Sequence, residues 1–222
     1  MLHLPYTAWH LSYVLIGAAL APHLHLVRLG ATVLAFALAV GVGAHGLDEL
    51  RGRPLGTAIP SPCLLAVSLA ALVGAAAIGA LGVTRVGWGL TGFIAVGVVL
   101  VVGYNLELWG GRLHSDTVFA AAWGAFPLLT GFYAQTGTIA PPVLVAAVFA
   151  YGLARAQRVL STEARFLRRR VRSVTGELVG ADGTHHPLTR QGLLQPVERS
   201  LATLSWATCA LGIALVLANV SR

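Results

Sequence analysis

The stretch "LGATVLAFALAVGVGAHGLDELRGRPLGT", Leu29–Thr57, is an apolar run that ends abruptly in a histidine, two adjacent acids and two arginines. A helix needs about 20 mostly apolar residues to cross the hydrocarbon core of a bilayer. The part from Leu29 to Leu50 meets that length. It therefore predicts a transmembrane helix with a cluster of polar residues at one edge of the membrane.

Apolar runs of this kind recur along the chain. Of its 222 residues, 56% are hydrophobic and 10% are charged, whereas about a quarter of the residues in soluble domains are charged. The pattern predicts an all-α, polytopic membrane helical bundle with about seven transmembrane helices. We expect the first run to be kept as a helix, because the basic residues that open a signal peptide are missing. The seven predicted spans are Thr7–Leu26, Leu29–Leu50, Pro62–Val83, Trp88–Trp109, Thr117–Gln135, Ala140–Leu160 and Leu201–Val220.

The basic residues are all arginines, which excludes a retinal Schiff base and a catalytic lysine amine. Because cytoplasmic loops carry an excess of basic residues, their distribution predicts a cytoplasmic N-terminus and an outside C-terminus. The net charge of +7 then needs no nucleic-acid partner. Loops after the second, fourth and sixth spans, with the stretch entering the seventh, hold Arg51, Arg53, Arg112, Arg155, Arg158, Arg165, Arg168, Arg169, Arg170, Arg172, Arg190 and Arg199. The other side holds Arg28, Arg85 and Arg222.

The predicted organisation has three parts. Residues 1–160 form a six-helix transmembrane core, residues 161–200 a basic cytoplasmic segment, and residues 201–222 the seventh helix. The basic run "EARFLRRRVR", Glu163–Arg172, could lie along an anionic leaflet. The following "SVTGELVGADGTHHPL", Ser173–Leu188, has two short strand-like runs around turn residues, which predicts a small β-hairpin.

Ionisable side chains gather at the cytoplasmic ends of the predicted spans. His45 and Glu49 share one helix face, and so do Tyr104 and Glu107 at the end of the fourth span. Such groups are costly in lipid unless they face a partner or a cavity, so they are candidates for function. The other members of this set are His10, Asp48, His114 and Asp116.

Simpler roles stay open for several of them. Asp48 and Glu49 could pair with the nearby arginines at a solvated helix end, and Asp116 could cap the fifth helix. His10 could belong to an aromatic belt at the headgroups. Glu107 has apolar neighbours in "GYNLELWGG" and no basic residue within four positions, so a structural role explains it least well.

Two stretches resemble the UbiA superfamily of intramembrane prenyltransferases. The first is "AHGLDELRGRPLGT", Ala44–Thr57, where the family has an Asn-Asp-x-x-Asp-x-x-x-Asp signature, often followed by Arg-Pro-Leu, here Arg53-Pro54-Leu55. The second is "YNLELWGGRLHSDTVFAAAWGAFPLLTGFYAQTG", Tyr104–Gly137, which is similar to the family's passage from the fourth to the fifth helix. This resemblance implies transfer of an isoprenoid chain from a prenyl diphosphate to a lipophilic acceptor.

The chain departs from the family pattern. With His45 in the place of the family's asparagine, the three aspartate places hold Gly46, Glu49 and Arg53, so a single carboxylate remains. The region of the family's second acidic motif contains only Glu163. The family usually has eight or nine spans, whereas the sequence predicts seven.

A prenyltransferase on this chain would need a metal and cations. Carboxylates with histidine can hold a divalent ion such as Mg²⁺, and a metal with arginines stabilises a diphosphate leaving group. The predicted catalytic residues are His45, Glu49 and Glu107, and the predicted metal ligands are Asp48, Glu49, Glu107, His114 and Asp116. The predicted substrate-binding residues are Arg53, Tyr104, Asn105, Arg112 and Arg158.

Two other functions remain open. The chain could be a catalytically silent membrane protein that binds a lipid or quinone on the same fold. It could also hold a membrane metal site for redox or hydrolytic chemistry, built from His10, His45, Glu49, Glu107 and His114. The sequence leaves open whether this protein is an enzyme.

Overall fold

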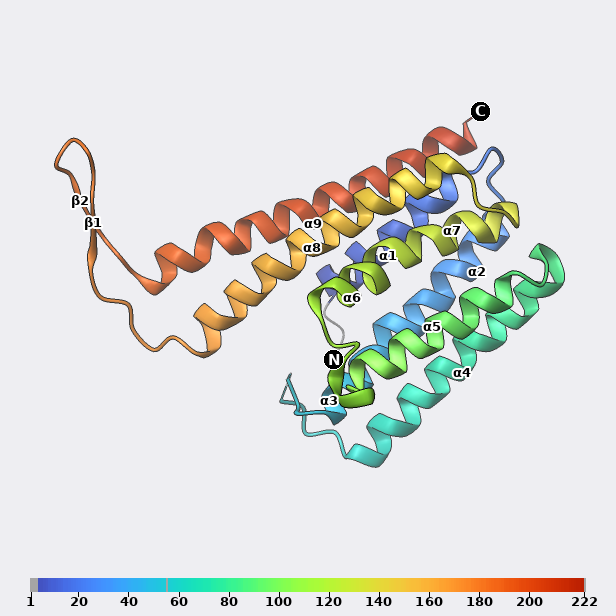
Figure 1. The fold of residues 1–222 in the computed structure, drawn as a ribbon, viewed down its shortest axis with the longest axis horizontal. Helices are drawn as coiled ribbons and strands as arrows, with labels where there is room; N and C mark the ends of the chain where they lie inside the picture. Colours follow the sequence, from blue (N-terminus) through green and yellow to red (C-terminus); the bar gives the residue numbers. More distant parts are fainter. Residues whose placement is uncertain (1–3, 55, 222) are drawn as a thin grey trace.

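The protein is an all-α bundle with one small hairpin, as the computed structural model of residues 4–54 and 56–221 shows (Figure 1). Leu55 of the predicted Arg-Pro-Leu element and Arg222 lie outside the described residues. The α-helices are α1 Leu4–Ala19, α2 Leu26–Phe36, α3 His45–Leu50, α4 Ser61–Val86, α5 Leu90–Asn105, α6 Asp116–Ala120, α7 Phe126–Thr136, α8 Pro141–Arg169 and α9 Arg190–Val220. A short 3₁₀ turn, Trp109–Gly111, lies in the loop after α5.

Two π-helical segments join shorter helices into continuous rods. Ala37–Ala44 connects α2 to α3, which gives one rod from Leu26 to Leu50, and Ala121–Ala125 connects α6 to α7. Five rods are long and apolar enough to cross a membrane: Leu26–Leu50, Ser61–Val86, Asp116–Thr136, Pro141–Arg169 and Arg190–Val220. The helix Leu90–Asn105 is apolar but shorter, and α1 has 16 residues. The all-α class is therefore confirmed, and the five helices of spanning length fit an integral membrane protein.

Several predicted helix ends are wrong, for local reasons. The first helix ends at Ala19 and not at Leu26, just before Pro22, which cannot continue a helical hydrogen-bond ladder. Helix α5 ends at Asn105 and not at Trp109, because Glu107 has φ 50° and leaves the right-handed helical region. Tyr104 and Glu107 therefore do not share a helix face.

Helices α8 and α9 extend well beyond the predicted spans. With 29 residues, α8 is about 43 Å long, whereas the hydrocarbon core is about 30 Å thick. The run Glu163–Arg169 thus continues α8, and α9 begins at Arg190 and not at Leu201. Figure 1 shows the two helices side by side, leading to the hairpin that projects from the bundle. Arg168 and Glu198 form an ion pair between them.

The predicted hairpin consists of β1, Glu177–Val179, and β2, His185–Pro187. The strands are antiparallel, with Leu178 opposite His186, and all six residues are exposed.

Helix α1 lies inside the bundle between α7 and α9. Trp9 and Tyr13 are fully buried there, and the Trp9 indole donates to the Tyr13 hydroxyl at 2.8 Å. The backbones of α1 and α7 touch at two glycines. A Cβ on Gly17 would lie 1.9 Å from the Leu128 carbonyl oxygen, and one on Gly131 would lie 2.4 Å from that of Val14. Small residues allow this close packing in membrane helices.

Candidate functional site

The two acids at the end of the rod Leu26–Leu50 have different surroundings. Glu49 is 1% exposed, and its Oε1 accepts hydrogen bonds from the Thr57 amide at 2.7 Å and the Thr57 hydroxyl at 2.8 Å. A buried carboxylate needs such donors. Glu49, a predicted metal ligand, therefore fixes the loop that leads to α4.

Asp48 lies within electrostatic range of cationic side chains from several parts of the chain. Arg158 and Arg165 of α8, with His45 and His114, lie close enough to act electrostatically on its carboxyl. The Tyr104 ring stacks on the His114 ring, with their centroids 4.5 Å apart. We call Asp48, His45, Tyr104, His114, Arg158 and Arg165 the Asp48 group. The tertiary structure thus brings together five predicted site residues and Arg165, from four separate stretches of sequence.

Two members of the group have further contacts. The Nδ1 atom of His45 lies 2.7 Å from the Val40 carbonyl oxygen, five residues earlier in the π-helical segment. The Tyr104 side chain is 4% exposed, and its hydroxyl has no hydrogen-bond partner among residues 4–54 and 56–221. Neighbouring Asn105 donates to the Val101 carbonyl at 2.7 Å and so bonds back to its own helix.

Glu107 lies in the loop after α5. Its carboxylate forms an ion pair with Arg51 at 2.9 Å, and the His114 ring is 4.0 Å away. The hydrogen bond from Arg51 holds the pKa of Glu107 below its ordinary value. The basic partner is 56 residues away in sequence, so a search of the four neighbouring positions could not find it.

Asp116 joins the start of α6 to α8. It pairs with Arg155 at 3.0 Å and with Arg158 at 3.0 Å. The helix cap is Ser115, whose hydroxyl accepts from the Val118 amide at 3.2 Å. The expected capping role therefore belongs to the preceding residue.

Three other predicted residues lie away from the Asp48 group or have a different role. Arg53 donates to the backbone carbonyls of Thr57 and Ile59, at 2.7 and 2.9 Å, and so stabilises its own loop. Arg112 is exposed in the loop before α6. His10 is 4% exposed, with Nδ1 2.9 Å from the Trp123 carbonyl oxygen, so it lies in the bundle interior and not at a headgroup belt.

The predicted metal ligands do not form a ready-made shell. Within the part of the chain that the structure describes, no three His, Cys, Asp or Glu side chains come close enough to hold a metal ion. Glu107 and Asp116 pair with arginines instead. Magnesium stays a prediction.

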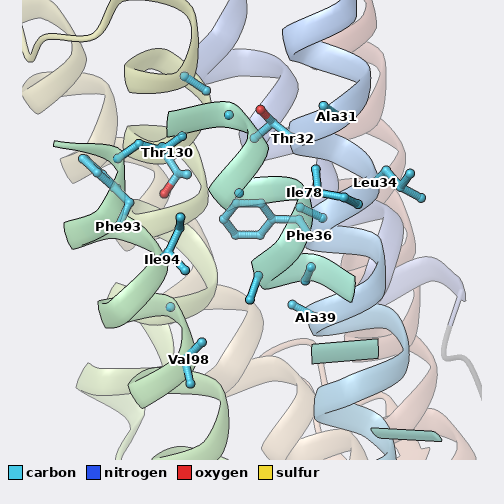
Figure 2. A pocket seen from close by; sticks show the side chains of 18 of the residues that line it. Ala31, Thr32, Leu34, Phe36, Ala39, Ile78, Phe93, Ile94, Val98 and Thr130 are labelled. Carbon is cyan, nitrogen blue, oxygen red and sulfur yellow. The ribbon is translucent and has the colours of Figure 1, made fainter. Parts of the chain in front are cut away.

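A large apolar cavity lies between the rod Leu26–Leu50, α4, α5 and α7. Its volume is about 610 Å³. Figure 2 shows Phe36, Ala39, Phe93 and Ile94 around it. The lining hydroxyls of Thr32 and Thr130 donate to carbonyls of their own helices, at 2.7 and 2.8 Å. The wall therefore offers mainly hydrocarbon and aromatic surface.

Trp123 lies between this cavity and the Asp48 group. It lines the cavity, and its ring centroid is 4.9 Å from that of Tyr104. Both π-helical segments line the end of the cavity next to the Asp48 group, which we call its deep end. Ala39 and Val40 line it from one segment, and Ala122 and Trp123 from the other. Segments of this kind often occur at functional sites.

Three residues that matter for the site could not be singled out from the sequence pattern used above, or only in part. Gln157 is 0% exposed, and neither atom of its amide group has a partner among the described residues. It lies on the buried face of α8 with Ala150 and Ala154, so helical periodicity could have found it. In the sequence, Arg28 serves only as a topology signal, and Arg165 only as a topology signal and as part of the basic run Glu163–Arg172. Their contacts with distant helices could not be inferred from composition.

Compared with protein family models, curated proteins and solved structures, this chain shows no match. The structure defines an all-α protein with five helices long and apolar enough to cross a membrane. The likeness to the UbiA superfamily rests on two stretches of sequence.

Proposed function

We propose that this protein binds the hydrocarbon chain of a membrane lipid in the cavity between the rod Leu26–Leu50, α4, α5 and α7. The supporting observation is an apolar cavity of about 610 Å³, within the range of about 300–1,000 Å³ that is typical of ligand pockets. Seven helices would then cross the membrane, including α1 and α5, with the N-terminus in the cytoplasm and the C-terminus outside.

The physical basis is contact between hydrocarbon surfaces. Inside a bilayer, binding depends on van der Waals packing, because lipid tails are as apolar as the protein surface. The side chains around an empty apolar space lack van der Waals partners on one side, and a bound lipid chain supplies them. Leu34, Leu81 and Val98 line the cavity and are 52%, 72% and 40% exposed, so the cavity opens toward the outer surface of the bundle.

A cavity-filling variant with a matched control tests the proposal. Ala76 lines the cavity, whereas Ala77 is exposed on α4 and does not. The protein is reconstituted in phosphatidylcholine vesicles that contain a lipid with a photoreactive acyl chain. We expect crosslinks to cavity residues in the wild type and in Ala77→Phe, with strong loss in Ala76→Phe. Equal labelling of both variants would refute the proposal.

Prenyl transfer is the second candidate. Its support is the Asp48 group, where an acid, two histidines and two arginines adjoin the deep end of the cavity through Trp123. Arg158 and Arg165 would hold the diphosphate, and the cavity would take the isoprenoid chain. Three of the predicted metal ligands, Glu49, Glu107 and Asp116, are engaged in loop and helix contacts. In this scheme Asp48 is therefore the remaining predicted acid that could bind a metal.

The enzymatic proposal has its own test. Purified protein is incubated with a labelled prenyl diphosphate, Mg²⁺ and a panel of quinone-type acceptors. Turnover that is lost in Asp48→Asn and kept in Glu163→Gln would support it. No turnover and no magnesium-dependent binding of the prenyl diphosphate would rule it out, while acyl-chain labelling would still support lipid binding. Metal analysis of the same preparation tests the membrane metal site.

A further inference from the structure

The two ends of the cavity differ in charge. The end at the loop before α2 and the C-terminus of α4 carries Arg28 and Arg85, both of which line the cavity. We call this the Arg85 end. The chain has eight acidic residues, and all of them lie in or beside α3, the loop after α5, α6, the hairpin and the opposite ends of α8 and α9. No carboxylate in the described residues therefore neutralises the Arg85 end.

Arg28 holds this end in place. Its two terminal nitrogens donate to the Gln135 carbonyl of α7 at 2.9 Å and to the Arg85 carbonyl of α4 at 2.8 Å. The backbone of Arg85 is thereby fixed beside the cavity mouth. The Arg85 guanidinium itself is exposed and, within residues 4–54 and 56–221, has no hydrogen bond or ion pair in the structure.

The length of the cavity along α4 is close to the thickness of one membrane leaflet. It is lined along α4 from Leu72 to Val86, which corresponds to about 20 Å of helix. Half of a hydrocarbon core is about 15 Å, with the headgroups beyond it. Trp88, 82% exposed just after α4, is typical of the headgroup level. A lipid chain in the cavity would thus place its headgroup beside Arg85.

We propose that the occupant is an anionic phospholipid of the leaflet at the Arg85 end, with its phosphate on Arg85 and one chain in the cavity. Guanidinium groups bind phosphate oxygens through paired, charge-assisted hydrogen bonds. An anionic phospholipid lacks the choline cation that neutralises the phosphate charge in phosphatidylcholine, so it should bind Arg85 more strongly. This inference rests on the proposed lipid binding and specifies its ligand class and its direction. It places the headgroup at the end of the cavity opposite to the Asp48 group.

The test measures lipid preference. Delipidated protein in detergent is titrated with phosphatidylglycerol or phosphatidylcholine, and bound lipid is counted by native mass spectrometry. We expect the wild type to prefer phosphatidylglycerol. In Arg85→Gln this preference should fall about fivefold, which is the effect of one basic group near an anionic membrane surface. Arg85→Lys should keep most of it. Arg199→Gln, at an exposed arginine of α9, should keep all of it.

The outcomes separate the two proposals. If Arg85→Gln keeps the full preference while Ala76→Phe still reduces binding of both lipids, the anionic headgroup site is refuted and chain binding stands. If Ala76→Phe binds both lipids like the wild type, both proposals fail.

Discussion

Arg51 and Glu107 form an ion pair at 2.9 Å that joins the end of the rod Leu26–Leu50 to the loop after α5. The two residues come from the two stretches that resemble the UbiA superfamily. This pairing changes the interpretation of Glu107. It has no basic residue nearby in sequence, but Arg51 supplies one across the bundle. The contact is structural, and it lies next to the Asp48 group, because the Glu107 carboxylate is 4.0 Å from Nδ1 of His114.

The pair predicts a pH-dependent contribution to stability. Because pairing lowers the pKa of Glu107 in the folded state, the pair stabilises the protein above the ordinary value of 4.5. Its contribution is lost as the pH falls through the lowered pKa. Glu107→Gln should therefore lower the melting temperature at neutral pH, and the difference should shrink in acid and in high salt. Glu163→Gln, exposed on α8, is the control. An equal difference at all pH values would contradict the prediction.

Glu49 should matter for folding more than for lipid binding. Glu49→Gln weakens two hydrogen bonds to a buried carboxylate, which we expect to cost about 1–3 kcal/mol. Thr57→Val removes only the hydroxyl donor and should cost less, and the two effects should not add. Thermal unfolding in detergent measures this. Photolabelling of the cavity should be unchanged, because Glu49 does not line it. A fully stable Glu49→Gln protein would count against this role.

Gly17 should tolerate no side chain. A Cβ there would lie 1.9 Å from the Leu128 carbonyl oxygen, so Gly17→Ala must push α1 from α7, and we expect a loss of about 1–3 kcal/mol or more. Gly30 in α2 has nothing within 4 Å of the corresponding position, so Gly30→Ala should be close to neutral. Unfolding temperature and the monodisperse fraction in detergent are the readouts. Similar behaviour of the two variants would disprove this packing.

Gln157 should be dispensable for stability. Its amide is fully buried without a partner in the described residues, and an unpaired buried polar group costs about 1–3 kcal/mol. Gln157→Met keeps a similar shape, and we expect it to raise the free energy of unfolding by about 1 kcal/mol. Gln191→Met, at an exposed position of α9, should have no effect. A destabilised Gln157→Met would show that a bound polar group satisfies the amide.

The sequence alone predicted the membrane class and most of the rods. Spanning length and hydropathy are local properties, because a helix in lipid must satisfy its own backbone and present apolar side chains. The run Leu29–Leu50 therefore became a rod almost at the predicted bounds. The predicted hairpin also formed, because turn residues act over a few positions. The ends at Ala19 and Asn105 were missed, since proline and left-handed backbone ended those helices earlier than hydropathy indicated.

The partners of each charge were decided only by the tertiary structure. Glu107 pairs with Arg51 and Asp116 with Arg158 because helix packing places them together, over separations that no local pattern encodes. The cavity likewise exists only where four helical segments leave space between them. In sequence, its lining residues are the same apolar residues that occur in any membrane helix. Hydropathy decides where a chain crosses the membrane, whereas side-chain packing between helices decides which groups are left to bind a ligand.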